Sequence, residues 1–88
     1  MNKTYRFISD PGHGWLEVPL SDIKELGLKS GDCPTGITCF SYRNNKMAYL
    51  EEDCDASLFL NTAKEKGWVV AYNNVYQENT PIRGYNSF

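Results

Sequence analysis

The chain has 88 residues, of which 41% are hydrophobic and 23% are charged, and its formal net charge is −2. This length and balance predict a single small globular domain spanning residues 1–88. The lysines and arginines are scattered singly, which argues against direct nucleic-acid binding because a duplex requires clustered positive charge. No run of 18 apolar residues is present, so the sequence predicts no membrane span.

Two short strands are expected at residues 5–8 and 15–18, joined by a turn with the sequence DPGHG at residues 10–14. Pro11 stiffens this turn, and the glycines on either side of His13 permit backbone angles that other residues resist. The turn can therefore present the imidazole of His13 and the indole of Trp15 from a rigid base. His13 is a structural residue, a partner contact or a catalytic group, and the sequence leaves these alternatives open.

A short helix is expected next, beginning at Ser21 as the N-cap. Gly27 followed by Leu28 is typical of a Schellman ending, in which a glycine closes the helix and an apolar residue packs behind it. Residues 29–36 are rich in turn-forming residues and are expected to form a loop.

A hairpin is expected from strands at residues 37–42 and 47–50, with Asn44 and Asn45 as a type I′ turn. This register would pair Tyr42 with Met47. It would also place Phe40 opposite Tyr49 on the same, aromatic face. Such a face is either covered by other elements or exposed as a binding surface.

The second helix carries the strongest periodic signal in the chain. The apolar stripe predicted to dock on the sheet comprises Ala56, Phe59, Leu60 and Ala63. Asp53 or Asp55 is expected to cap its start and Gly67 to end it. A strand is expected at residues 68–72, and residues 76–88 are expected to form a partly ordered tail with a last short strand around residues 82–85.

These elements follow one another in the order β-β-α-β-β-α-β. Short strands with a clear hairpin predict an α+β fold: a mainly antiparallel sheet of about four to five short strands, with two helices on one side.

Cysteine usage predicts three free thiols at Cys33, Cys39 and Cys54, in a reducing compartment. Cys39 and Cys54 are expected at buried positions. With no apolar leader in residues 1–6, the expected location is the cytoplasm of a bacterial host cell. No Cys-x₂-Cys spacing, phosphate-binding loop or nucleophile elbow is present, so we expect no metal site, no cofactor and no enzymatic activity.

Acidic residues are densest at residues 51–55. They form either a patch for a basic partner or a set of helix-capping acids, and one acid can cap while Glu51 and Glu52 face solvent. The residues predicted to contact a partner are Glu51, Glu52, Tyr42, Tyr49, His13, Arg83 and Tyr85. Tyrosine and arginine are enriched at interface hot spots.

The segments SDPGHGWLEV at residues 9–18 and YLEEDCD at residues 49–55 resemble a family of small uncharacterised proteins encoded by bacteriophages and mobile elements. The likeness includes the segment around Arg83 and Tyr85. The resemblance transfers no catalytic residue. It implies a phage-type protein made inside a bacterial cell, and small proteins of this kind commonly bind and block a host protein, anti-CRISPR inhibitors among them.

The resulting hypothesis is a non-enzymatic accessory protein that binds a host protein or protein complex, as an inhibitor of host defence. Two alternatives remain. One is a small-ligand or metal-dependent enzyme that uses His13 and the nearby acids. The other is a structural or regulatory phage component that self-associates, for example as a homodimer, through a sheet edge.

Overall fold

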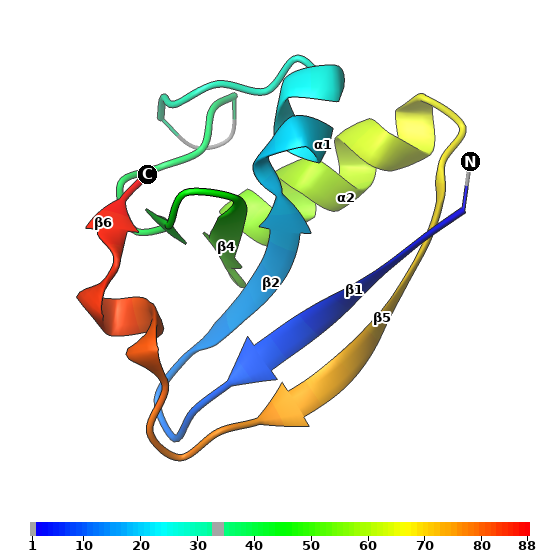
Figure 1. Ribbon diagram of the computed structural model, residues 1–88. Helices are drawn as coiled ribbons and strands as arrows, with labels where there is room; N and C mark the ends of the chain where they lie inside the picture. The colour runs from blue at the N-terminus through cyan, green and yellow to red at the C-terminus, as the bar shows by residue number, and fades with distance from the viewer. Residues whose placement is uncertain (1, 33–34) are drawn as a thin grey trace.

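The computed structural model describes residues 2–32 and 35–88, except for the side chain of Arg83. The chain forms an α+β fold in which two helices lie against one six-stranded sheet (Figure 1). The elements in chain order are β1 (Asn2–Ser9), β2 (Gly14–Pro19), α1 (Leu20–Glu25), β3 (Tyr42–Arg43), β4 (Met47–Glu51), α2 (Asp55–Glu65), β5 (Val69–Tyr76), the 3₁₀ helix η1 (Pro81–Gly84) and β6 (Asn86–Ser87). The predicted fold class and element order are confirmed.

The sheet has the strand order β5-β1-β2-β4-β3-β6. Strands β1 and β5 run parallel, and the other neighbouring strands run antiparallel. The strand count exceeds the expected four to five because the C-terminal residues add β6, next to β3. The centre of the sheet is therefore formed by β1, β2 and β4, whose side chains alternate between two faces.

The two faces of the sheet carry separate apolar clusters. On the helix side, the predicted stripe of α2 packs against the sheet, with Ala56, Phe59 and Ala63 buried and Leu60 half-buried. The opposite face carries a smaller cluster of buried residues, namely Ile8, Trp15, Tyr49 and Ile82. This second cluster lies beneath the C-terminal segment, so the helix-free face is only partly open.

Both predicted glycine helix endings are confirmed. Gly27 has φ +74° and Gly67 has φ +82°, which are left-handed angles that a side chain disfavours. Behind Gly27, the Leu28 amide donates to the Ile23 carbonyl at 3.1 Å, as a Schellman motif requires. The predicted N-caps are wrong: Pro19 precedes α1 and Cys54 precedes α2, and neither side chain caps its helix.

The predicted hairpin register is wrong by two residues, although the shared face is right. Tyr42 pairs with Tyr49 instead of Met47. The side chain of Asn44 accepts hydrogen bonds from the amides of Lys46 and Met47 at 2.9 and 2.8 Å. This side-chain turn replaces the expected type I′ turn, and no described residue other than glycine has a positive φ. A shift of two residues keeps every side chain on its expected face.

The first expected strand of that hairpin, at residues 37–42, is mostly a loop. The buried carboxylate of Asp55, at the start of α2, accepts from the amide and hydroxyl of Thr38 at 3.0 and 2.7 Å, and from the hydroxyl of Ser41. These bonds wrap residues 38–41 around the helix start. Only Tyr42 and Arg43 then remain available for the sheet.

Tyr76 is the last residue of β5, and the chain after it returns across the helix-free face, where Ile82 and Tyr85 pack on the second cluster, before Asn86–Ser87 join the sheet as β6. The expected strand around residues 82–85 is wrong, because residues 81–84 form η1, with the Thr80 hydroxyl accepting from the Ile82 amide at 3.3 Å. Ile82 is buried, and the Phe88 amide donates to the Ser41 carbonyl at 2.8 Å. The C-terminus is therefore anchored at both of these points.

The cysteines differ from expectation. Cys39 is free but exposed, and Cys54 is disulfide-bonded, so the prediction of three free thiols is wrong. Cys33 lies outside the described residues. Disulfides are uncommon in reducing compartments, so the cysteine argument for a cytoplasmic location no longer holds. Within the described part of the chain, neither helix is long and apolar enough to cross a membrane.

Candidate functional site

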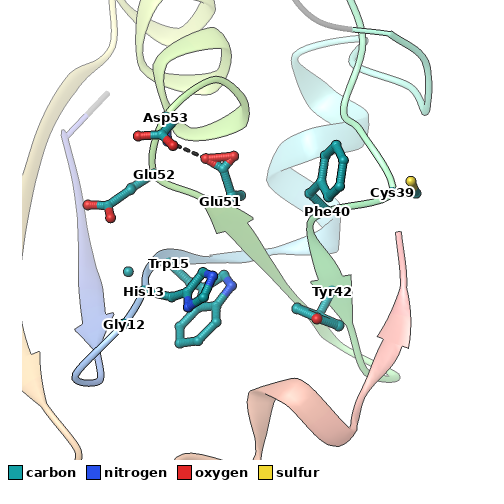
Figure 2. A pocket seen from close by; sticks show the side chains of 10 residues that line it. Gly12, His13, Trp15, Cys39, Phe40, Tyr42, Glu51, Glu52 and Asp53 are labelled. Carbon is teal, nitrogen blue, oxygen red and sulfur yellow. Dashed lines mark hydrogen bonds between the residues drawn. The ribbon is translucent and has the colours of Figure 1, made fainter.

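A cavity of about 490 Å³ lies where the β1–β2 turn, the loop before β3 and the β4–α2 junction meet (Figure 2). We call it the His13 pocket. Its lining residues are Gly12, His13, Gly14, Trp15, Cys39, Phe40, Tyr42, Glu51, Glu52 and Asp53. Its volume lies within the range of about 300–1,000 Å³ that is usual for ligand sites.

Asp10 builds the turn that carries His13. Its carboxylate oxygen Oδ1 accepts from the amides of Gly12 and His13 at 2.9 and 2.8 Å, and its own amide donates to the His13 carbonyl at 2.9 Å. An aspartate that folds a turn over its own side chain is a common stabilising device. The backbone of His13 is therefore held firmly, while its side chain remains exposed.

Gly14 is required for close packing and not, as expected from the sequence, for backbone freedom. Its φ is not in the left-handed region. A Cβ atom at this position would lie 2.7 Å from the Phe7 ring and 3.1 Å from the Glu52 carboxylate. Glycine thus lets β1 and the β4–α2 junction approach the base of the pocket. The Glu52 amide donates to the Gly14 carbonyl at 3.1 Å and fixes this approach.

Aromatic rings form the floor of the pocket. The rings of His13 and Trp15 are stacked, with centroids 5.8 Å apart and planes at 12°, and Tyr42 meets the Trp15 ring edge-on at 6.4 Å. Trp15 is only 1% exposed, so it is a fixed support for the more accessible His13. Figure 2 shows the imidazole of His13 over the indole of Trp15 at one side of the pocket, with Phe40 at the other side.

Three carboxylates form one wall. Glu51 pairs with Trp15 across β2 and β4, which places it directly above the aromatic floor. Glu51 also accepts from the Asp53 amide. Glu52 and Asp53 are exposed. The pocket lining includes no lysine or arginine, so this wall has a local excess of negative charge.

Phe40 forms the opposite wall and is 71% exposed, which is unusual for a phenylalanine in a small domain. The Asp55 hydrogen bonds described above hold its loop, and the Ser41 hydroxyl also accepts from the Glu51 amide at 3.0 Å. Ser41 therefore connects the aromatic wall to the acidic wall. The free thiol of Cys39 lies beside Phe40, at the rim.

Four of the predicted contact residues meet in this pocket: His13, Tyr42, Glu51 and Glu52. Tyr85 lies elsewhere, at a hollow beside the hairpin turn, and the side chain of Arg83 lies outside the described part of the structure.

The ring of Tyr49, which was predicted to contact a partner, is buried. It is 5% exposed because Tyr85 packs on it, with centroids 5.3 Å apart. Burial, followed by interaction with Glu17, raises the pKa of the Tyr49 hydroxyl. The phenol is therefore held neutral as part of the buried cluster on the helix-free face.

The predicted contact residues do not include Phe40, Cys39 or Asp53, which also line the pocket. Phe40 was expected inside a strand, and only its position beside a polar, hydroxyl-rich segment could have indicated a loop. Trp15 was identified with the turn but not as the floor of a site.

The arrangement does not resemble a metal centre. Among residues 2–32 and 35–88, no group of three or more histidine, cysteine, aspartate or glutamate side chains is placed to hold a metal ion.

No protein-family model, curated protein or solved structure matches the chain.

Proposed function

We propose that this protein is a non-enzymatic binding protein that holds a basic segment of a host protein in the His13 pocket. The observation that carries the proposal is the meeting of three carboxylates with exposed aromatic surface in one cavity of about 490 Å³. Four residues that the sequence predicts to contact a partner line this pocket: His13, Tyr42, Glu51 and Glu52.

A lysine or arginine side chain can interact with both the acidic wall and the aromatic wall of the pocket. Carboxylates form charge-assisted hydrogen bonds with ammonium and guanidinium groups. The faces of Phe40 and Tyr42 attract the same cations through their ring quadrupoles, by about 0.5–2 kcal/mol each depending on desolvation. An exposed ion pair alone contributes little, so the rings supply the affinity while the acids steer the approach and select positive charge.

The resemblance to phage-encoded proteins supports a bacterial host protein as the partner and inhibition of host defence as the outcome. A binding protein acts by covering a surface, which requires no catalytic group. The pocket suits this role because Glu52 and Asp53 are exposed, where a protruding side chain of a larger protein can reach them.

The experiment is capture of a partner from bacterial lysate by the tagged protein, followed by affinity measurement with the purified partner. The test variants are Glu51→Lys with Glu52→Lys, and separately Phe40→Ser. The matched charge control is Glu25→Lys with Glu65→Lys, which changes net charge equally at two exposed helix C-terminal positions, where positive charge is favourable. Tyr76→Ser, on β5, is the control for Phe40 because Tyr76 is 64% exposed.

We expect the double lysine variant to lose at least tenfold in affinity and Phe40→Ser to lose about five- to thirtyfold, equivalent to about 1–2 kcal/mol. Both controls should bind as the unmodified protein does. Raised salt should weaken the unmodified complex. A partner that binds all four variants equally would overturn the assignment of this pocket.

A further inference from the structure

Strand β5 is an unprotected edge of the sheet. It pairs with β1 along its full length, from Val69 beside Asn2 to Tyr76 beside Ser9, and it is the last strand on that side (Figure 1). Its outer backbone amides and carbonyls are thus available to another strand. The opposite edge is only two residues long, because β6 spans Asn86–Ser87.

The composition of β5 is unusual for an edge. Natural edge strands are commonly protected by charged residues, proline or a bulge. The sequence VVAYNNVY contains no charged residue and no proline, and its continuous register with β1 contains no bulge. Three of the four exposed large hydrophobic residues described in the protein lie on this strand: Val69 at 64%, Tyr72 at 48% and Tyr76 at 64%.

We propose that β5 pairs with β5 of a second copy of this chain, antiparallel and around a two-fold axis, to form a dimer with a continuous sheet. A two-fold axis perpendicular to the sheet keeps each face on its own side, so residues that lie opposite one another must share a face. An axis that passes midway between Asn73 of one copy and Asn73 of the other satisfies this condition. It places Tyr76 opposite Val70 of the second copy and Val75 opposite Ala71 of the second copy.

This self-pairing is complementary in polarity and in charge. The pairs at both ends are apolar, Tyr72 lies opposite Asn74, and the central asparagine meets its own copy without like-charge repulsion. Lys64, Glu65 and Lys66 precede β5 and together carry one net positive charge, and Glu78 follows the strand. Antiparallel pairing brings the basic end of one strand beside the acidic end of the other, whereas parallel pairing would bring like charges together. A second copy is therefore the occupant that the strand fits.

The test is the mass in solution, measured by sedimentation and light scattering over a range of concentrations. We expect the unmodified protein to reach twice the 10.0 kDa mass of one chain. Asn73→Lys and Asn73→Asp should each dimerise more weakly than the unmodified protein, because either change puts like charges opposite one another at the axis. An equimolar mixture of the two variants should restore the dimer, because lysine then faces aspartate.

Asn73 is exposed, so neither substitution removes a core contact, and circular dichroism of each variant checks that the fold is retained. Hydrogen exchange supplies a second readout: amides of residues 69–76 should become more protected as concentration rises. Phe40→Ser, in the His13 pocket, should dimerise normally, which separates this proposal from the proposed function. If the unmodified protein is still monomeric at millimolar concentration, the proposal is wrong. The partner of β5 would then be a strand of another protein. A dimer that forms equally well in the unmodified protein, Asn73→Lys and Asn73→Asp would overturn it in favour of a different interface.

Discussion

Replacing Asp55 with alanine is expected to destabilise the fold and release one wall of the His13 pocket at the same time. The Asp55 side chain is fully buried. Its Oδ2 atom accepts from the amide of Thr38 at 3.0 Å, from the Thr38 hydroxyl at 2.7 Å and from the Ser41 hydroxyl. Alanine would leave all three donors without this acceptor. The loop that carries Phe40 would then lose its attachment to α2.

The magnitude follows from the number and type of these bonds. A hydrogen bond to a charged group contributes about 1.5–3 kcal/mol to stability. A donor that can bind water after the mutation recovers part of this free energy, so the net loss is smaller. Thr38 is only partly buried. We therefore expect Asp55→Ala to lower the free energy of unfolding by about 3–5 kcal/mol. Asp55→Asn keeps a carbonyl oxygen as acceptor, and Ser41→Ala removes one of the three donors. Each should cost about 1–2 kcal/mol.

The assay is urea unfolding followed by tryptophan fluorescence, with stability compared at constant slope. Asp53→Ala is the control because Asp53 is exposed in the same segment, and it should remain within about 0.5 kcal/mol of the unmodified protein. A small domain can unfold completely when it loses about 5 kcal/mol, so Asp55→Asn and Ser41→Ala keep the test measurable. If both leave the midpoint unchanged, the carboxylate does not hold this loop and the reasoning is wrong.

Three further predictions concern the core, the pH response and the cysteines. Phe59→Ala should cost about 3–5 kcal/mol in urea unfolding, because the ring is fully buried at the centre of the helix-side cluster; a cost below about 1 kcal/mol would contradict that placement. Hydrogen bonding from Arg6 lowers the pKa of Glu17 in the folded protein. This carboxylate therefore stabilises the fold above its unfolded pKa of about 4. The stabilisation is lost as pH falls from there through the lower pKa of the folded state. Glu17→Gln should flatten this acidic part of the stability profile, and an unchanged profile would show that another group is responsible. Alkylation followed by mass spectrometry should modify Cys39 without prior reduction, and Cys54 only after the disulfide has been reduced. A chelator should leave the melting temperature unchanged, because a structural zinc would contribute much of the folding free energy.

Local patterns in the sequence predicted the parts of the fold that depend on local physics. The spacing of Ala56, Phe59 and Ala63 identified the buried face of α2 because helical periodicity places them on one side. Gly27 and Gly67 identified both helix ends because their positive φ angles favour glycine. These signals lie within a few residues of the structure they determine.

The errors arose where distant residues determine local structure. Residues 38–41 were expected in a strand, but they form a loop because Asp55, 17 residues away from Thr38, takes their hydrogen bonds. That error concealed Phe40 as a pocket wall. Tyr49 was predicted to contact a partner, but its ring is covered because Tyr85 returns from the C-terminal segment. Neither long-range contact has a periodic signal in the sequence.

Binding of a cation in the His13 pocket can be measured directly by titrating the isotopically labelled protein with a short arginine-containing peptide and recording amide and tryptophan indole shifts by NMR. The matched control peptide carries citrulline, which keeps the shape of arginine but removes its charge. We expect the arginine peptide to shift signals from residues 12–15, 39–42 and 51–53, and the citrulline peptide to leave them in place. Equal shifts with both peptides, or shifts confined to other parts of the chain, would contradict cation recognition by this pocket.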